Sequence, residues 1–264
     1  VLAVAQDGAE VQTGYSAPGK SVGLELFDLY PPKAVGEKAA RQALTNLKAR
    51  PAPAGTFPVV VGPGFGGVLF HEAVGHLLET TSVARKASVL ADKLGEVVAS
   101  PAVTYIDDGT LPHAWGSTEM DDEGRPTERT VLIEKGVLKS YMVDRLGHLL
   151  TGYPMTGSGR RQDYTFAPTS RMRNTFLAPG EARVEDLFAG IAFGLYAKEM
   201  GGGQVKPGSG EYNFAVQEGY IIRKGRIEEP VRGAMLVGKG PETLMRVVAV
   251  AQDLENAPGM CGSL

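Results

Sequence analysis

The chain contains 264 residues, of which 43% are hydrophobic and 22% are charged, and its net charge at pH 7 is −3. This length and composition are typical of a folded protein with one large domain or two small ones. The negative charge argues against nucleic acid as the main partner, because binding to phosphates needs a basic surface. No apolar run reaches the roughly 18–20 residues of a membrane-spanning helix, so we expect no membrane association.

The cysteine content and the first residues indicate the compartment. Cys261 is the only cysteine, so the chain cannot form an internal disulfide, which fits a reducing environment. Residues 1–6 lack both the basic leader and the long apolar core of a signal peptide. We therefore expect a cytoplasmic protein. The chain starts without an initiator Met, which favours a processed chain or a fragment.

The first third of the chain predicts three regular elements before a Gly-rich loop. Alternating apolar residues over 19–29 predict a strand with one buried face, and helical spacing over 34–49 predicts a helix. A short apolar strand is expected over 57–61, followed by the loop at 62–67. No Lys-Ser/Thr pair follows this loop as in a phosphate-binding P-loop. We interpret the loop as a tight turn that seats the next helix close to a strand.

That next segment carries the residues with the clearest chemistry. Residues 71–76 read His-Glu-Ala-Val-Gly-His within an apolar helical run. His71 and His76 could bind a zinc ion, and Glu72 could accept a proton from a zinc-bound water. Ligands five residues apart diverge on a regular helix, since five residues advance the direction by about 140° and four by about 40°. We therefore predict a π-type turn near Gly75. The alternative is a buried amphipathic helix with two incidental histidines.

The rest of the chain favours antiparallel sheets over βαβ units, because hairpin patterns and Gly-rich connections recur. The expected elements are strands over 103–106 and 211–222, hairpins pairing 130–133 with 137–143 and 220–222 with 226–227, helices over 185–193 and 242–254, and loops at 201–204 and 206–210. We predict an α+β fold of mainly antiparallel sheets, sandwich or barrel-like, with the metal-binding helix packed on them.

Several other residues allow more than one interpretation. The Arg160-Arg161 pair could bind a substrate carboxylate, remain solvated, or hold a neighbouring acidic loop. Glu79 could orient a metal ligand or be a surface carboxylate. Cys261 lies in a Gly-flanked turn and could be a thiolate ligand or a small buried hydrophobe. The sequence assigns no oxyanion-stabilising residue.

Motifs spread over nearly the whole chain resemble the TldD/PmbA family, and the TldD branch in particular. They are His-Glu-Ala-Val-Gly-His at 71–76, Asp-Asp-Glu-Gly-Arg-Pro-Thr at 121–127, Gly-Arg-Arg-Gln at 159–162, Arg-Met-Arg-Asn-Thr at 171–175, Gly-Gly-Gly-Gln-Val at 201–205, Phe-Ala-Val-Gln-Glu-Gly-Tyr at 214–220, Val-Arg-Gly-Ala at 231–234 and Ala-Pro-Gly-Met-Cys-Gly at 257–262. One departure lies at 80–82, where Thr-Thr-Ser replaces the family's Gly-Asp-Phe.

The resemblance implies a cytoplasmic zinc metallopeptidase that hydrolyses unfolded or extended peptides. It further implies Zn²⁺ ligands at His71, His76 and Cys261, with Glu72 as the general base. Family members pair with themselves or with a PmbA-like paralogue, and carry an additional N-terminal domain and further strands beyond the cysteine. Residues 1–264 are thus expected to form one C-terminal-type metallopeptidase domain, truncated at both ends.

A non-catalytic role is the alternative to peptide hydrolysis. The chain could be a peptide-binding or structural-zinc subunit of a TldD/PmbA-type complex. A structural zinc site needs four protein ligands. The remaining histidines, His113 and His148, lie in unrelated sequence contexts and are not convincing as the fourth.

Overall fold

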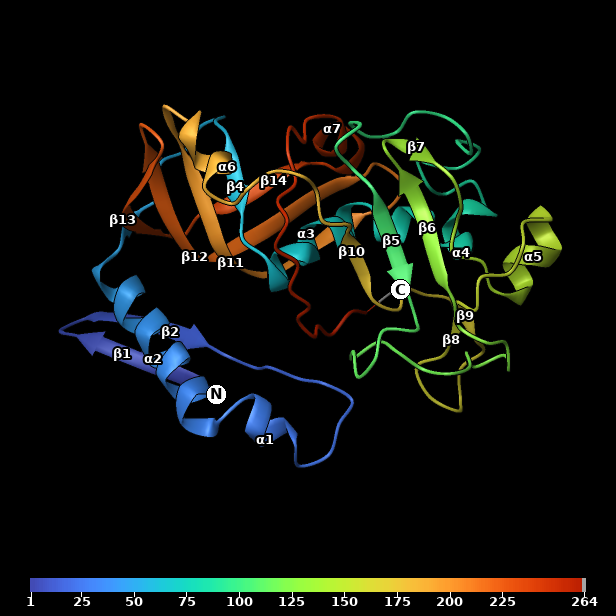
Figure 1. Ribbon diagram of the computed structural model, residues 1–264, viewed down its shortest axis with the longest axis horizontal. Coiled ribbons are helices and arrows are strands. Elements are labelled where there is room, and N and C mark those ends of the chain that lie inside the picture. The colour runs from blue at the N-terminus through green and yellow to red at the C-terminus, as the bar shows by residue number, and fades with distance from the viewer. Residues whose placement is uncertain (263–264) are drawn as a thin grey trace.

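The structure is a computed structural model that describes residues 1–262. Two main β-sheets flank a broken helical segment in the middle of the molecule (Figure 1). The helices are α1 (Leu26–Leu29), α2 (Pro32–Lys48), α3 (Val68–Ala73), α4 (Thr80–Val83), α5 (Arg145–Thr151), α6 (Asp186–Ala189) and α7 (Gly240–Met245), with 3-10 turns η1 (Gly64–Gly67) and η2 (Gly75–Leu78). The strands are β1 (Leu2–Asp7), β2 (Glu10–Tyr15), β3 (Arg50–Pro51), β4 (Val59–Val61), β5 (Tyr105–Asp108), β6 (Arg129–Glu134), β7 (Val137–Leu138), β8 (Gly159–Arg160), β9 (Thr169–Ser170), β10 (Thr175–Leu177), β11 (Phe193–Lys206), β12 (Glu211–Arg223), β13 (Arg226–Arg232) and β14 (Met235–Lys239).

The sheets are mainly antiparallel, as predicted. The larger one has the order β3-β13-β12-β11-β4, with β14 pairing β12, and the smaller one has the order β10-β5-β6-β7. Only the β4–β11 and β3–β13 pairs among the strands of residues 1–262 are parallel. Separate two-stranded sheets are formed by β1–β2 and β8–β9. The α+β class is confirmed, and within the described range no sheet closes into a barrel.

Both predicted hairpins form through the same two-residue turn. Lys135 and Gly136 join β6 to β7 with φ of 45° and 86°, and Lys224 and Gly225 join β12 to β13 with φ of 47° and 76°. Positive φ at both central residues is the signature of a type I′ turn, whose twist matches that of the two strands. Glycine supplies one of the two left-handed positions at no steric cost in each hairpin.

The N-terminal part differs from its prediction. The strand expected over 19–29 is wrong, because this segment bends and ends in α1, with Leu24 80% exposed. The helix over 34–49 is confirmed as α2, and it packs on the β1–β2 hairpin. This hairpin was missed, although Asp7-Gly8 between alternating residues predicts one. Its Gly14 lies so close to α2 that a Cβ would be 2.0 Å from the Ala39 carbonyl oxygen.

Three further predictions failed at the C-terminal side. The helix over 185–193 is only the short α6, and Phe193 already begins β11, where it pairs with β12. Residues 201–204 are not a loop but belong to β11, where the pairing with β12 shifts register several times between Ala197 and Gly203. The helix over 242–254 is shorter than predicted, since α7 ends at Met245. The run of glycines in residues 201–204 has a low strand propensity, and this part of β11 is extended because it pairs with β12.

The broken segment of α3 and η2 belongs to two hydrophobic cores at once. Leu69 of α3 packs in the core under β11 and β12 with Leu195 and Phe214. Leu77 and Leu78 of η2 are fully buried in the other core, which lies beneath β5, β6 and β7. The segment is therefore fixed between the two sheets, where Figure 1 shows α3.

The Gly-rich loop before α3 is a tight turn, as predicted. A Cβ at Gly62 would lie 2.3 Å from the carbonyl oxygen of Lys198 in β11, so the loop runs directly against that strand.

Across residues 1–262, no helix combines the length and apolar character needed to cross a bilayer.

Candidate metal centre

The window over residues 71–76 is a broken helix. α3 ends at Ala73, Val74 has φ of −131° and ψ of −51°, and η2 begins at Gly75. The π-type turn predicted near Gly75 is therefore wrong. The helix breaks at Val74 and continues as a tighter 3-10 turn, and this change of direction accommodates the extra residue between the two histidines. The break occurs here because Leu77 and Leu78 of the 3-10 turn are buried in the second core.

Close packing explains the glycine in this window. A Cβ at Gly75 would lie 2.1 Å from Sδ of Met172 and 3.1 Å from the hydroxyl oxygen of Tyr105. Both of these side chains are buried. Glycine is needed here for the close approach of the core and not for a special backbone angle.

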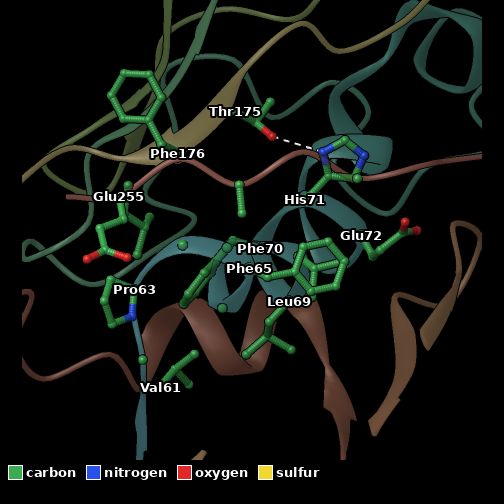
Figure 2. A pocket seen from close by; sticks show the side chains of 18 of the residues that line it. Val61, Pro63, Phe65, Leu69, Phe70, His71, Glu72, Thr175, Phe176 and Glu255 are labelled. Atoms are coloured by element: carbon green, nitrogen blue, oxygen red, sulfur yellow. Dashed lines mark hydrogen bonds between the residues drawn. The ribbon is translucent and has the colours of Figure 1, made fainter. Parts of the chain in front are cut away.

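The break turns the two imidazole rings toward each other. Their centroids are 5.4 Å apart, with the ring planes at 85°. Nδ1 of His71 hydrogen-bonds to Oγ1 of Thr175 at 2.9 Å (Figure 2), and Nδ1 of His76 hydrogen-bonds to Oε2 of Glu79 at 3.0 Å. Each ring is thus held through Nδ1, which leaves Nε2 for a ligand. Nε2 of His71 is buried with no hydrogen-bond partner among the described residues, as expected of an atom that binds a metal.

Cys261 reaches the same point from the other end of the chain. Its Sγ lies 3.0 Å from Nε2 of His76, and Oε2 of Glu72 lies 3.3 Å from that nitrogen. The possible ligand atoms of His71, Glu72, His76 and Cys261 all lie within 4.8 Å of one another. The structure brings together the four residues that the sequence singled out.

The chemistry of these donors fits a zinc ion, since imidazole nitrogens and a thiolate are typical zinc ligands. Burial, and next the neighbouring His76, lower the pKa of His71 to about 4, so its ring is neutral at neutral pH, the form that binds a metal. Burial opposes charge on His76, but its hydrogen bonds to Cys261, Glu72 and Glu79 raise its pKa to about 11. The acidic groups around this ring favour a positive charge, which a divalent cation would supply.

A buried arginine connects the broken helix, through Glu79, with the C-terminal turn that carries Cys261. Nε of Arg171 lies 3.6 Å from Oε1 of Glu79, and both side chains are buried. Nη2 of Arg171 donates hydrogen bonds to Cys261, at 3.2 Å to Sγ and 3.5 Å to the carbonyl oxygen. Of the two alternatives for Glu79, the structure favours the orienting one. Arg171 and Thr175 were not predicted to belong to the site. Arg171 is 90 positions from Cys261 and Thr175 is 104 positions from His71, so only the fold brings each pair together.

The other two histidines lie apart from this group. His113 is exposed in a loop, and Nδ1 of His148 in α5 hydrogen-bonds to the carbonyl oxygen of Tyr153 at 2.7 Å. Neither belongs to the cluster of possible ligands found among residues 1–262.

The centre opens into a large groove. Its volume is about 2120 Å³, against the roughly 300–1,000 Å³ of a small-molecule pocket, so it can hold an extended chain segment. Around His71 and Glu72 the lining is apolar, with Val61, Phe65, Leu69, Phe70 and Phe176 (Figure 2).

Comparison with known proteins matches a family model described as the PmbA/TldA metallopeptidase C-terminal domain, over residues 54–263. A metalloprotease TldD homologue of Haemophilus influenzae is 45% identical over 228 residues, which are 86% of this chain and 47% of that protein. A zinc metalloprotease TldD homologue of Saccharolobus solfataricus is 32% identical and covers 89% of this chain and 53% of its own. The chain thus spans about half the length of these relatives.

Two solved structures share the fold. TldE from Thermococcus kodakarensis has a TM-score of 0.77 at 22% identity, covering 96% of this chain and 58% of that one. A Thermotoga maritima protein described as a candidate modulator of DNA gyrase has a TM-score of 0.80 at 26% identity, covering 97% and 58%.

Proposed function

The chain belongs to the PmbA/TldD metallopeptidase family, and on this basis we propose that it is the metal-binding part of a zinc-dependent peptidase. His71, His76 and Cys261 would hold Zn²⁺, and Glu72 would be the general base. The observation that carries this proposal is the convergence of these three donors, within 4.8 Å of one another and of a Glu72 carboxylate oxygen, beside a groove that His71, Glu72 and Cys261 line. That residues 1–264 form one C-terminal-type metallopeptidase domain is part of the proposal.

When bound, Zn²⁺ supplies Lewis acidity that polarises a peptide carbonyl and makes a water more acidic. The chain's own contribution begins with Glu72. In the metal-free chain burial opposes its charge, but the hydrogen bond and the charge of His76 outweigh this and hold the pKa of Glu72 below its usual value. With His76 neutral as a zinc ligand, the charge of the cation would act on Glu72 in the same direction. Its carboxylate is therefore ionised at neutral pH, able to accept a proton from the attacking water and pass it to the leaving amine.

Unfolded or extended peptides are the proposed substrates. Among the strands of residues 1–262, β10 lies at the edge of its sheet and pairs with β5 alone, and its Thr175, Phe176 and Leu177 line the groove. β4 is the edge of the larger sheet and lines the groove as well. An extended chain could pair with either edge through its backbone, which gives affinity with little sequence selectivity. A folded protein could not present its backbone in this way.

Glu72 also keeps the non-catalytic alternative open. Counted as a ligand, it brings the protein donors at this point to four, the number of a structural zinc site. In that case the chain would be a peptide-binding or structural-zinc subunit. Assembly with itself or with a PmbA-like paralogue is a further part of the proposal, which the mass of the purified protein in solution tests.

The test of the proposal is the zinc content and peptide hydrolysis of the full-length protein and its Cys261→Ser variant, measured on the same samples. We expect the variant to lose both together, because serine replaces the thiolate by a weak neutral ligand. Full zinc binding and full activity in Cys261→Ser would remove Cys261 from the centre. Zinc binding by the wild type without hydrolysis of any peptide would favour the structural alternative.

A further inference from the structure

Three arginines gather beside the metal centre, and they differ in what their guanidinium groups bind. Arg171 is engaged with Glu79 and Cys261. Nη2 of Arg173 donates to the carbonyl oxygen of Gly159 at 2.9 Å. Arg160, in β8, makes a single side-chain hydrogen bond, from Nη1 to the carbonyl oxygen of Met172 at 3.3 Å.

The guanidinium groups of Arg160 and Arg173 both lack a carboxylate partner among the described residues, and Arg160 is the one whose side chain makes only a single, long hydrogen bond. Within residues 1–262, no carboxylate oxygen lies within 4 Å of its guanidinium. Burial, followed by the charges of Arg171 and Arg173, lowers its pKa, so the surroundings disfavour its positive charge. Its side chain is half-buried and lines the groove together with His71 and Glu72. A charged group in such a place costs free energy unless an anion joins it.

The neighbouring Arg161 has a different environment. It is exposed, and its backbone N–H donates to Oδ2 of Asp122 at 2.8 Å, so the chain at this position holds the acidic loop. Both arginines line the groove, but they differ in exposure. Arg160 is half-buried beside Arg171 and Arg173, whereas the side chain of Arg161 is exposed to solvent, where a charge needs no partner.

We propose that Arg160 binds a carboxylate of the substrate and so positions the peptide against the metal centre. This inference rests on the proposed function and adds a substrate feature to it. The planar guanidinium can hold a carboxylate through two parallel hydrogen bonds. The carboxylate could be the C-terminal one of a short peptide or an acidic side chain near the scissile bond. The apolar lining beside His71 would then accept a hydrophobic side chain of the same peptide.

The test uses the zinc-loaded full-length protein and matched peptides. One pair has the same sequence with either a free C-terminal carboxylate or an amide, and a second pair is amidated and differs by Glu or Gln near the scissile bond. kcat/KM is measured for wild type, Arg160→Met, Arg160→Lys and Arg161→Met. Binding of the same peptides to a Glu72→Gln background is measured by fluorescence anisotropy, so that recognition is observed without cleavage.

We expect the wild type to prefer the carboxylate peptide in at least one pair by about tenfold, the effect of a charge-assisted hydrogen bond. Arg160→Met should bring this ratio close to one with little change for the neutral peptide, Arg160→Lys should keep part of the preference, and Arg161→Met should keep the wild-type ratio. The pair that shows the preference identifies the source of the carboxylate.

Other outcomes contradict the inference or separate it from the proposed function. Equal kcat/KM and equal binding within both pairs, or equal losses for all peptides in Arg160→Met, would overturn the role of Arg160. A failure of the wild type to cleave any peptide, combined with Arg160-dependent binding of the carboxylate peptides, would instead contradict peptide hydrolysis and leave carboxylate binding in place.

Discussion

The guanidinium of Arg171 donates a hydrogen bond of 3.2 Å from Nη2 to Sγ of Cys261, although the two residues are 90 positions apart. The same guanidinium faces Glu79, which holds the ring of His76. Arg171 therefore fixes the C-terminal turn relative to the broken helix. The centre exists only where these distant parts of the chain fold against each other.

Arg171→Met should weaken zinc binding by about 10–100-fold, because residues that support metal ligands typically contribute this much to affinity. Arg171→Lys should lose less, since it retains the charge but not the planar fork. Competition with a chromogenic chelator measures the affinity. The matched control is Arg183→Met, which removes an exposed arginine from a surface ion pair. An Arg171→Met protein that binds zinc as tightly as the control would contradict this role.

Gly75→Ala should lower the free energy of unfolding by about 1–3 kcal/mol, the usual cost of overpacking a core. The new Cβ would meet Sδ of buried Met172 at 2.1 Å. Urea unfolding measures the effect, and adding Met172→Ala should make Gly75→Ala less costly than it is in the wild type. Gly36→Ala in α2 is the control, because no atom lies within 4 Å of its Cβ position and alanine favours a helix by up to about 1 kcal/mol. Equal stabilities of the two single variants would count against the packing account.

Asp107 should make the protein less stable as the pH rises from about 4 to about 7. Burial raises its pKa from the ordinary 3.8 to about 7. In this window the folded protein keeps a proton that the unfolded chain has lost, so stability decreases with pH, by on the order of 4 kcal/mol at about 1.4 kcal/mol per pKa unit. Below the window both states are protonated, and above it neither is, so the contribution no longer changes.

Asp107→Asn removes this titration and keeps an oxygen that can accept the hydrogen bond from the backbone N–H of Arg173. Urea unfolding of both proteins between pH 4 and pH 7.5 gives the difference in their free energies of unfolding. This difference should grow in favour of the variant as the pH rises. Parallel curves over the whole range would show that Asp107 is ionised in the folded protein.

The sequence predicts those features that depend on short spacing or on local turn chemistry. The Lys-Gly turns determine both hairpins, and the six-residue window of His71, Glu72 and His76 predicts a shared site that needs a distorted helix. Cys261 is a candidate thiolate from its Gly-flanked turn, but its place beside the histidines comes only from the family resemblance, since nothing in its spacing connects it to them. Thr175 and Arg171 are common residue types whose roles arise only from the sheets that carry them.

The failed predictions share a physical cause, which is that tertiary packing overrides local pattern. Residues 19–29 alternate in hydrophobicity but pair with no sheet, so Leu24 remains exposed. The Gly-rich residues 201–204 extend as a strand because β12 pairs with them. The spacing of His71 and His76 indicated a distorted helix, but the form of the distortion was set by the burial of Leu77 and Leu78 in the second core.

The most direct test of a catalytic zinc centre is the Glu72→Gln variant of the full-length protein, in which zinc content and peptide hydrolysis are measured on one preparation. If Glu72 is the general base, the variant should bind close to the wild-type amount of zinc and lose at least about 100-fold in kcat, the lower range of a general-base contribution. A variant that loses its zinc, or one that keeps both its zinc and its wild-type kcat, would contradict the assignment of Glu72 as the base.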